Sequence, residues 1–244
     1  MVSPDVSQLF PFPLDGFQLE SIDALNQGHS VVVSAPTGSG KTLVGEYAIH
    51  RAIAHGQKVF YTTPLKALSN QKLRDFREEF GAENVGLMTG DLSVNREARV
   101  VVMTTEIFRN MLYAEVDEHD DPLADVESVV LDECHYMNDS QRGTVWEESI
   151  IHCPPSVQLV ALSATVANAG QLTDWIEKVH GPTRLVLSDF RPVPLEFSFC
   201  SAKGLHPLLN EQGNRTKITE HQTCRTVHLL DPIGELPRIG NGGG

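Results

Sequence analysis

The chain has 244 residues, of which 41% are hydrophobic, and its 19 basic and 32 acidic residues give a formal net charge of -13. This length allows one sizeable core, or one core and the beginning of a second unit. The acidic balance argues against a broad basic face that would hold nucleic acid by charge alone. Any contact with a nucleic-acid strand must therefore be local.

The cysteines and the amino terminus indicate a cytoplasmic or other reducing intracellular compartment. None of the four cysteines forms a CxxC pair or a plausible disulfide framework: Cys134, Cys153, Cys200 and Cys224. We expect neither zinc nor disulfides. The chain starts with acidic Asp5 and several prolines instead of a basic and then an apolar stretch, and no apolar run reaches spanning length. We therefore expect no export and no membrane partner.

Apolar, β-branched runs alternate with helix-like stretches along the chain. The runs predict strands at Ser30 to Ser34, Lys58 to Thr62, Arg99 to Met103, Glu127 to Leu131 and Val157 to Leu162. Helical patterns occupy Thr42 to Ala54, Lys66 to Glu79, Glu106 to Ala114, Trp146 to Ile151 and Gln171 to Val179. Such alternation requires right-handed crossovers, so we predict an α/β, three-layer sandwich with a mostly parallel sheet.

Polar residues recur directly after the predicted strands, at positions 36–42, 64–71, 104–109, 132–135 and 163–165. Ligands of open parallel sheets bind at this carboxyl edge. The repetition predicts one shared site there. By contrast, the acidic stretch Asp117 to Asp121 lacks the spaced ligands and the turn glycine of a calcium loop, so we interpret it as a solvated connection.

The segment Ala35 to Thr42 has the composition of a phosphate-binding loop between a strand and a helix. Its glycines permit backbone angles that turn N–H groups around phosphate oxygens. The helix terminus contributes about 1 kcal/mol, whereas micromolar ATP binding needs about 8 kcal/mol. Lys41 must therefore add charge at the outer phosphates, and Thr42 a hydroxyl to Mg²⁺. The predicted cofactor-binding residues are Pro36, Thr37, Gly38, Ser39, Gly40, Lys41 and Thr42; the alternative is a simple glycine turn.

Two adjacent carboxylates follow the apolar residues Val129 to Leu131. Bare Asp132 and Glu133 would repel each other, and a divalent cation removes that penalty. We expect Asp132 to hold Mg²⁺, through water, and Glu133 to orient and deprotonate an attacking water. A solvated acidic turn is the alternative, but it fits poorly with the apolar lead-in.

His135 could connect the nucleotide site with the hydroxyls of Ser163 and Thr165, which follow a later strand. An ordinary structural histidine and a strand-end turn are the alternatives, and on chemistry alone they are equally acceptable. Cys134 is interpreted as a packing residue.

The order of these segments resembles the first RecA-like domain of superfamily 2 DExH-box helicases. Motif I corresponds to Ala35 to Thr42, motif II to Asp132 to His135, and motif III to Ser163 to Thr165. Longer stretches resemble the superkiller-like RNA helicases: FPLDGFQ at 12–18, TPLKALSNQK at 63–72 and DECHYMND at 132–139. The resemblance covers Phe10 to about Asn210.

The resemblance implies further binding residues. Phe12 would stack on adenine and Gln18 would hydrogen-bond its edge, although a hydrophobic staple near a helix start is an alternative for Phe12. Single-stranded RNA, or DNA, would contact Pro64, Lys66, Ser69, Asn70, Gln71, Thr89, Gly90, Thr104, Thr105 and Arg109. Hydroxyls and helix-start N–H groups bind phosphates without a basic surface. Taken singly, each of these segments could equally be a helix cap.

The resemblance also implies an incomplete enzyme. Related helicases continue into a second RecA-like domain with arginines that complete the ATP site, and no such arginine-rich segment occurs here. We expect residues 1–29 to carry the adenine motif, 30–200 to form the ATP-binding domain, and 201–244 to be a linker or the start of the second domain. The isolated chain should be a weak ATPase at best. Rival interpretations are a DNA helicase, a nonenzymatic nucleotide- or strand-binding module and, last, a small-molecule kinase.

Overall fold

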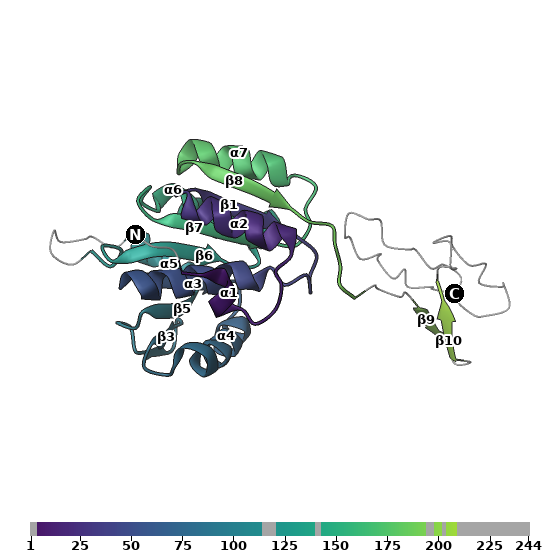
Figure 1. Cartoon of the computed structure of the whole chain (residues 1–244), viewed down its shortest axis with the longest axis horizontal. Coiled ribbons are helices and arrows are strands. Elements are labelled where there is room, and N and C mark those ends of the chain that lie inside the picture. Colours follow the sequence, from purple (N-terminus) through teal and green to yellow (C-terminus); the bar gives the residue numbers. More distant parts are fainter. Residues whose placement is uncertain (1–3, 114–120, 140–142, 194–197, 202–203, 209–244) are drawn as a thin grey trace, which may run out of the picture. The chain divides into compact units, whose positions relative to one another are not determined.

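The computed structural model describes residues 4–113, 121–139, 143–193, 198–201 and 204–208 (Figure 1). The chain divides into two compact units, Met1–Phe190 and Arg191–Gly244. Most of the predicted solvated loop, residues 117–120, lies outside the described residues. The domain limits expected after residues 29 and 200 stay a prediction.

The first unit is built on one eight-stranded sheet with the order β4-β3-β5-β2-β6-β7-β1-β8. Neighbouring strands are parallel except for the antiparallel pair β3 and β4. This confirms the mostly parallel sheet. The strands are β1 Ser30–Ser34, β2 Lys58–Thr63, β3 Val85–Met88, β4 Ser93–Val94, β5 Val100–Thr104, β6 Val126–Leu131, β7 Gln158–Ser163 and β8 Thr183–Leu187.

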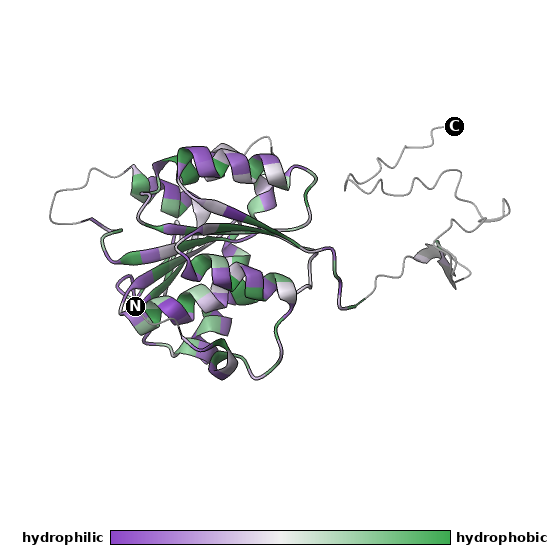
Figure 2. Ribbon diagram, turned by 45° about the horizontal axis from the view of Figure 1, so that its top comes forward, coloured by the Kyte–Doolittle hydropathy of each residue, from purple (hydrophilic) through white to green (hydrophobic). Residues whose placement is uncertain are grey.

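Helices cover both faces of the sheet (Figure 2). Residues of α2, α3 and α4 share one buried cluster with the strands, and residues of α5, α6 and α7 share another. The three-layer α/β sandwich is therefore confirmed. The helices are α1 Val6–Leu9, α2 Gly16–Asn26, α3 Thr42–His55, α4 Lys66–Phe80, α5 Thr105–Leu112, α6 Gly143–His152 and α7 Ala169–Val179, with a 3₁₀ turn, η1, at Cys134–Asn138.

The central strands are apolar on both faces because both faces are covered. In β1, Val31 and Val33 pack in the cluster with α3, while Val32 packs in the opposite cluster with Trp146 of α6. This is the burial pattern of a parallel strand between two helix layers. It explains why the sequence shows continuous apolar runs instead of alternation.

The order of strands reverses direction once, and the helices change face at that point. The connections through α3 and α4 run from β1 to β2 and then to β3, whereas those through α5, α6 and α7 lead back across the sheet to β8. Right-handed crossovers in opposite directions place their helices on opposite faces. The reversal leaves β6, β7 and β1 side by side.

Several boundaries differ from the predictions. Helix α6 begins at Gly143, three residues before the expected Trp146, and α5 begins at Thr105. Ala114, the expected end of α5, lies outside the described residues. In the first unit, the sequence patterns missed the helices α1 and α2 and the strands β3, β4 and β8. Strand β3 is only four residues long and contains Gly86, whose missing Cβ leaves room for the carbonyl oxygen of Asn95.

The second unit contains one described antiparallel pair, β9 Ser198–Ser201 and β10 Gly204–Pro207. Its assignment as a linker or the start of another domain stays a prediction. Over the described parts of the chain, no helix combines the length and the apolar character needed to cross a membrane.

Candidate active site

The neighbouring strands β6, β7 and β1 bring the predicted site segments to one edge of the sheet. Ser34, at the end of β1, is in register with Ser163, at the end of β7. The backbone N–H of Ala35 donates to the carbonyl oxygen of Ser163 at 3.1 Å. Three segments therefore start from neighbouring strands: the loop after β1, the acidic segment Asp132 to His135 after β6, and the SAT segment Ser163 to Thr165 after β7.

The loop after β1 turns tightly before α3 begins. Gly38 and Gly40 have φ values of 83° and 85°, in the left-handed region that glycine adopts without strain. The Ser39 N–H donates to Pro36 O at 3.1 Å, and Lys41 is the N-cap of α3. Thr42 then opens the helix. The sequence prediction of a loop between strand and helix is confirmed in its backbone form.

The loop holds buried polar groups that fit an anionic ligand. The Lys41 side chain is only 6% exposed, although no described ion pair neutralises it. The Ser39 hydroxyl is buried and finds no hydrogen-bond partner within the described residues. A buried ammonium and an unpaired hydroxyl are costly unless a ligand satisfies them. A phosphate group provides both the charge and the acceptors that they lack.

Gln18 connects this loop with the helix α2. Its Oε1 accepts from the Asp15 N–H at 2.9 Å, and its Nε2 donates to Gly40 O at 3.0 Å. A Cβ added at Gly40 would lie 2.9 Å from that Nε2. Gln18 thus anchors the loop backbone, a role that the sequence reasoning missed, whereas its expected contact with adenine stays a prediction.

Asp132 forms hydrogen bonds with two residues of β2 and with the next residue of its own loop. Its N–H donates to Thr62 O at 3.0 Å, and its Oδ1 accepts from the Glu133 N–H at 2.9 Å. Its Oδ2 accepts from the Tyr61 hydroxyl at 2.8 Å. The carboxylate is 7% exposed. A buried acid with fixed oxygens is suited to binding a cation at the sheet edge.

Glu133 and His135 form a contact that reaches the SAT segment. Glu133 has φ 53°, an uncommon value for a residue other than glycine, and its Oε2 lies 3.2 Å from His135 Nδ1. The Ala164 N–H donates to the same nitrogen at 3.3 Å. Because one ring nitrogen cannot donate to Glu133 and accept from Ala164 at once, the ring proton selects between the two contacts.

The hydroxyls of the SAT segment differ in their surroundings. The Ser163 hydroxyl is buried and donates to Ala164 O at 2.8 Å, whereas Thr165 is exposed. Ser34 also donates to Ala164 O, at 3.4 Å. The structure thus brings His135 to Ala164, between the two hydroxyls predicted to receive it.

Asp132 and Thr42 carry oxygen donors of the kind that Mg²⁺ prefers. Within the residues that the structure describes, no group of three or more His, Cys, Asp or Glu side chains could hold a metal ion. Asp132 and the Thr42 hydroxyl provide one carboxylate and one hydroxyl oxygen. Mg²⁺ commonly binds through one or two such groups, together with water and substrate phosphates. The oxygen donors present therefore fit a nucleotide-bound Mg²⁺.

Ser69, Thr104 and Thr105, three of the residues predicted to contact nucleic acid, are buried, and the hydroxyls of Ser69 and Thr105 have partners inside the protein. The Ser69 and Thr63 hydroxyls are 2.7 Å apart, and the Thr105 hydroxyl donates to Thr63 O at 3.2 Å. Thr104 and Ser69 are buried, as is Pro64. These contacts join the starts of α4 and α5 at the ends of β2 and β5. Their side chains set the backbone positions of the two helix starts.

Lys66 and Arg109, the charged residues predicted to contact a nucleic-acid strand, are engaged in ion pairs. Lys66 Nζ lies 2.9 Å from Asp91 Oδ1, and the Thr89 hydroxyl donates to the same oxygen at 2.9 Å. The hydrogen bond from Lys66 is the main cause that lowers the pKa of Asp91 below its ordinary value. Arg109 Nη1 lies 3.5 Å from Glu148 Oε2. Three other residues predicted to contact nucleic acid are exposed: Asn70, Gln71 and Gly90.

Phe12 is 53% exposed, with its ring centroid 6.1 Å from that of Phe10. The staple alternative does not hold, because Asp15 is the N-cap of α2 and the staple position before it belongs to Leu14. A succession of ring contacts leads from Phe12 into the core through Phe10, His50, Phe80, Phe76 and Tyr61.

Two side chains near the site were not predicted from the sequence. Tyr61 belongs to an apolar run that indicates only a strand. Glu46 lies one turn after Thr42 in α3, where a glutamate normally indicates a solvated helix face. Burial, with Glu79 as a further cause, raises the pKa of Glu46 to about 7. Cys134 is buried, as expected, and burial raises the pKa of its thiol to about 12.

The fold and the site together define a nucleotide-binding α/β domain with a phosphate loop after β1 and an acidic segment after β6. Residues 15–172, more than half of the chain, match the model of the family described as "DEAD/DEAH box helicase". The chain belongs to this family, and the predicted relation to superfamily 2 DExH-box helicases of the superkiller-like type is confirmed.

Similar curated proteins carry helicase names. The chain is 54% identical over 211 residues to the DExH-box ATP-dependent RNA helicase DExH15, chloroplastic, of Arabidopsis thaliana, covering 86% of this chain and 18% of that protein. It is 55% identical over 186 residues to the probable helicase HelY of Mycobacterium tuberculosis, covering 76% and 20%. It is 47% identical over 232 residues to the exosome RNA helicase MTR4 of Homo sapiens, covering 94% and 21%. The chain thus spans about a fifth of each relative.

Among solved structures, the helicase MrfA bound to DNA is similar in fold. The TM-score is 0.59 at 21% identity, and the match covers 72% of this chain and 27% of that one. At this identity the likeness supports the RecA-like α/β fold alone.

Proposed function

We propose that this chain is the ATP-binding part of a DExH-box RNA helicase that couples ATP hydrolysis to RNA translocation or unwinding. The observation that carries the proposal is that the loop with buried Lys41, after β1, and the segment Asp132 to His135, after β6, leave the same edge of the sheet on either side of β7. A phosphate cradle and a cation-binding acid at one sheet edge are the two parts that triphosphate hydrolysis requires. The RNA helicase names of the relatives supply the substrate class.

The loop residues 36–42 and Gln18 bind the nucleotide. Backbone N–H groups around Gly38 and Gly40 surround the phosphates, and Lys41 supplies the full charge that the helix terminus lacks. Thr42 and Asp132 hold Mg²⁺, which when bound neutralises charge that develops on the phosphate oxygens. Exposed Phe12 offers its ring to the adenine base.

Glu133 orients the attacking water and accepts its proton. The contact of its Oε2 with His135 Nδ1 ties this carboxylate to Ala164, and hence to the SAT segment. In the tautomer with hydrogen on Nδ1 this nitrogen donates to Glu133, and in the tautomer with hydrogen on Nε2 it accepts from Ala164. His135 therefore links the state of the nucleotide to the segment after β7.

A single RNA strand binds along the starts of α4 and α5 and the loop of Thr89 and Gly90, whose neighbour Asp91 contacts Lys66 at the start of α4. Helix-start N–H groups and exposed amides provide uncharged phosphate contacts, which suits the net charge of -13. Lys66 and Arg109 join the strand by exchanging their carboxylate partners for phosphates. The same contacts would serve DNA, so discrimination requires a group that reads the 2′-hydroxyl.

A second RecA-like domain completes the reaction in this proposal. Positive groups on the far side of the γ-phosphate raise such rates by about 10³-fold or more. The isolated chain should therefore bind ATP or ADP and turn over slowly. We place it in a reducing intracellular compartment. A nonenzymatic strand- or nucleotide-binding module is the rival function, and stimulated turnover separates the two.

Nucleotide binding is the first test. Calorimetric titration with ADP or ATP plus Mg²⁺ should give micromolar binding, corresponding to about 8 kcal/mol. Lys41→Ala should weaken binding at least tenfold, whereas Glu133→Gln should bind as well as the parent. Lys58→Ala is the matched control, because Lys58 pairs with Glu97 at the start of β2, whereas the proposed site lies at the carboxyl ends of the strands. No heat of binding to folded parent protein would overturn the proposal.

Turnover is the second test, and it uses the chain joined to a second helicase domain. Glu133→Gln should abolish hydrolysis there without loss of binding. Single-stranded RNA should stimulate the parent protein more than DNA does; equal stimulation by both strands would favour the DNA helicase alternative. Strong RNA-stimulated turnover by the short chain would contradict its expected dependence on the second domain.

A further inference from the structure

Among the described residues, the buried hydroxyl of Tyr61 is the only side-chain group that donates a hydrogen bond to Asp132. The other donor to this carboxylate is the backbone N–H of Glu133. The hydroxyl donates to Oδ2 at 2.8 Å, and Tyr61 is fully buried in β2. No motif identified in the sequence includes this tyrosine. Its contact joins the strand that leads into the predicted RNA track to the acid predicted to hold Mg²⁺.

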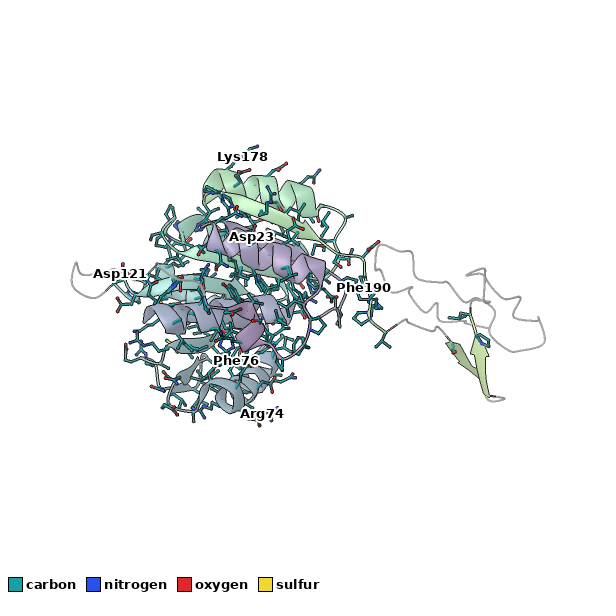
Figure 3. The ribbon with its side chains drawn as sticks, in the orientation of Figure 1. Asp23, Arg74, Phe76, Asp121, Lys178 and Phe190 are labelled. Carbon is teal, nitrogen blue, oxygen red and sulfur yellow. The ribbon has the colours of Figure 1, made fainter. Side chains whose placement is uncertain are left out.

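Packing leaves the Tyr61 ring little freedom to move. Phe76 of α4, labelled in Figure 3, lies edge-on to it with a centroid distance of 4.9 Å. The Lys72 ammonium lies 5.5 Å from the Tyr61 centroid and 5.6 Å from that of Phe76. On another side, a Cβ added at Gly45 of α3 would come within 3.0 Å of Tyr61 Cε2. The ring is therefore fixed by two helices.

The two hydrogen bonds to Asp132 fix its carboxylate plane. Oδ1 accepts from the Glu133 N–H at 2.9 Å and Oδ2 from Tyr61, so rotation of the group would break both bonds. Each oxygen can accept two hydrogen bonds or cation contacts, and among the described residues each has one hydrogen-bond donor, which leaves one position for a cation. The Tyr61 phenol is the donor in this contact, because a carboxylate oxygen can only accept.

We propose that Tyr61 is a positioning residue that holds the Asp132 carboxylate in the orientation in which it binds the magnesium of a bound nucleotide. The inference rests on the proposed function, since it requires Asp132 to hold that ion. Without the hydroxyl, only the bond from the Glu133 N–H would restrain the carboxylate, and part of the binding free energy would be spent on ordering it. Tyr61 acts through Asp132 and touches no phosphate.

The test compares two buried tyrosines. Tyr47 is also fully buried, and its hydroxyl donates to Asn26 Oδ1 at 2.8 Å, in a contact that includes no residue of the proposed site. ADP affinity is measured by calorimetry, once with Mg²⁺ and once with a chelator. Tyr61→Phe should reduce the magnesium-dependent gain about tenfold, equivalent to about 1.4 kcal/mol, and leave the magnesium-free affinity within about twofold. Tyr47→Phe should leave both affinities unchanged.

Replacement of Mg²⁺ by Mn²⁺ gives a readout independent of affinity. The electron paramagnetic resonance spectrum of Mn²⁺ with ADP should broaden in Tyr61→Phe and match the parent spectrum in Tyr47→Phe. If Tyr61→Phe does not fold, p-fluorophenylalanine at position 61 fills the volume without a donor, and p-aminophenylalanine restores a donor. The protein with p-aminophenylalanine should bind Mn²⁺ like the parent, and the protein with p-fluorophenylalanine should not.

The outcomes separate the inference from the proposed function. Parent protein whose ADP affinity does not depend on Mg²⁺ would overturn the proposed function. If Asp132→Asn loses the magnesium-dependent gain while Tyr61→Phe keeps all of it, the proposed function stands and the role of Tyr61 is wrong. Equal losses in Tyr61→Phe and Tyr47→Phe would also contradict the inference, because general destabilisation would explain both.

Discussion

Gln18 offers a sharp test of whether this glutamine only recognises a base or also builds the phosphate loop. A side chain that serves only adenine could be removed from the nucleotide-free protein at little cost. In the structure, however, the Gln18 amide accepts from the Asp15 N–H and donates to Gly40 O, and the side chain is buried. Both partners are backbone groups. Its removal should therefore destabilise the protein before any ligand is added.

The magnitude follows from the two bonds. Each contributes about 1 kcal/mol, and a buried backbone group left without a partner adds to the cost, so Gln18→Ala should lower the free energy of unfolding by about 2–3 kcal/mol. Gln18→Glu separates the two contacts, because a carboxylate can still accept from Asp15 but cannot donate to Gly40 O. It should loosen the loop at Gly40 while preserving the start of α2.

Urea unfolding of nucleotide-free protein measures these differences. The matched control is Gln27→Ala, since the Gln27 amide donates to Asp23 at an exposed site and should contribute less than about 0.5 kcal/mol. Calorimetric titration with ADP then reports whether the loosened loop binds phosphate more weakly. A loss below 0.5 kcal/mol in Gln18→Ala, similar to the control, would refute the anchoring role and leave only base recognition.

Three further predictions concern other groups. Because the folded protein raises the pKa of Glu46 to about 7, it retains a proton that the unfolded chain releases above about pH 4.5, and stability falls as pH rises between these values. Glu46→Gln should therefore unfold at a higher temperature than the parent at about pH 8, with a free energy of unfolding higher by at most about 3 kcal/mol, and it should match the parent near pH 4 in calorimetric scans. A difference in stability that stays the same over this pH range would contradict the assignment. Arg51 is 3% exposed and its Nε lies 2.9 Å from Glu127 Oε1. In urea unfolding, Arg51→Met should therefore lower the free energy of unfolding by about 3 kcal/mol or more. An unchanged free energy of unfolding would mean that the charge left on Glu127 is well solvated. Burial raises the thiol pKa of Cys134 and Cys153 to about 12, so iodoacetamide should label neither in native protein carrying serine at the other two cysteines, and both after addition of denaturant; rapid native labelling would show that these thiols are accessible.

The strand and helix patterns predicted much of the central sheet because its strands are buried on both faces. Val31 to Val33, Phe60 and Val129 to Leu131 stand in apolar runs whose meaning does not depend on distant residues. Edge elements lack this signal. In β8, exposed and half-buried positions alternate around the single buried residue Val186, and β3 is interrupted by Gly86, so local patterns gave no clear strand there.

The candidate site divides in the same way. The glycines and Lys41 of the loop, and Asp132 with Glu133, are recognisable because consecutive residues carry the chemistry, so the spacing is preserved in the sequence itself. The roles of Tyr61, Gln18 and Asp91 depend on partners 71, 22 and 25 positions away: Tyr61 meets Asp132, Gln18 meets Gly40, and Asp91 meets Lys66. No local pattern encodes these meetings.

The sequence by itself determined the nucleotide loop, the acidic segment, the α/β class and the likeness to DExH-box helicases, because each depends on residue types at short, fixed spacing. Only the tertiary structure decided which buried groups support them: the order of parallel strands sets which strand ends are neighbours, and that order results from packing the whole core. Tyr61 and Gln18 reach the site for this reason, through folding that joins distant parts of the chain.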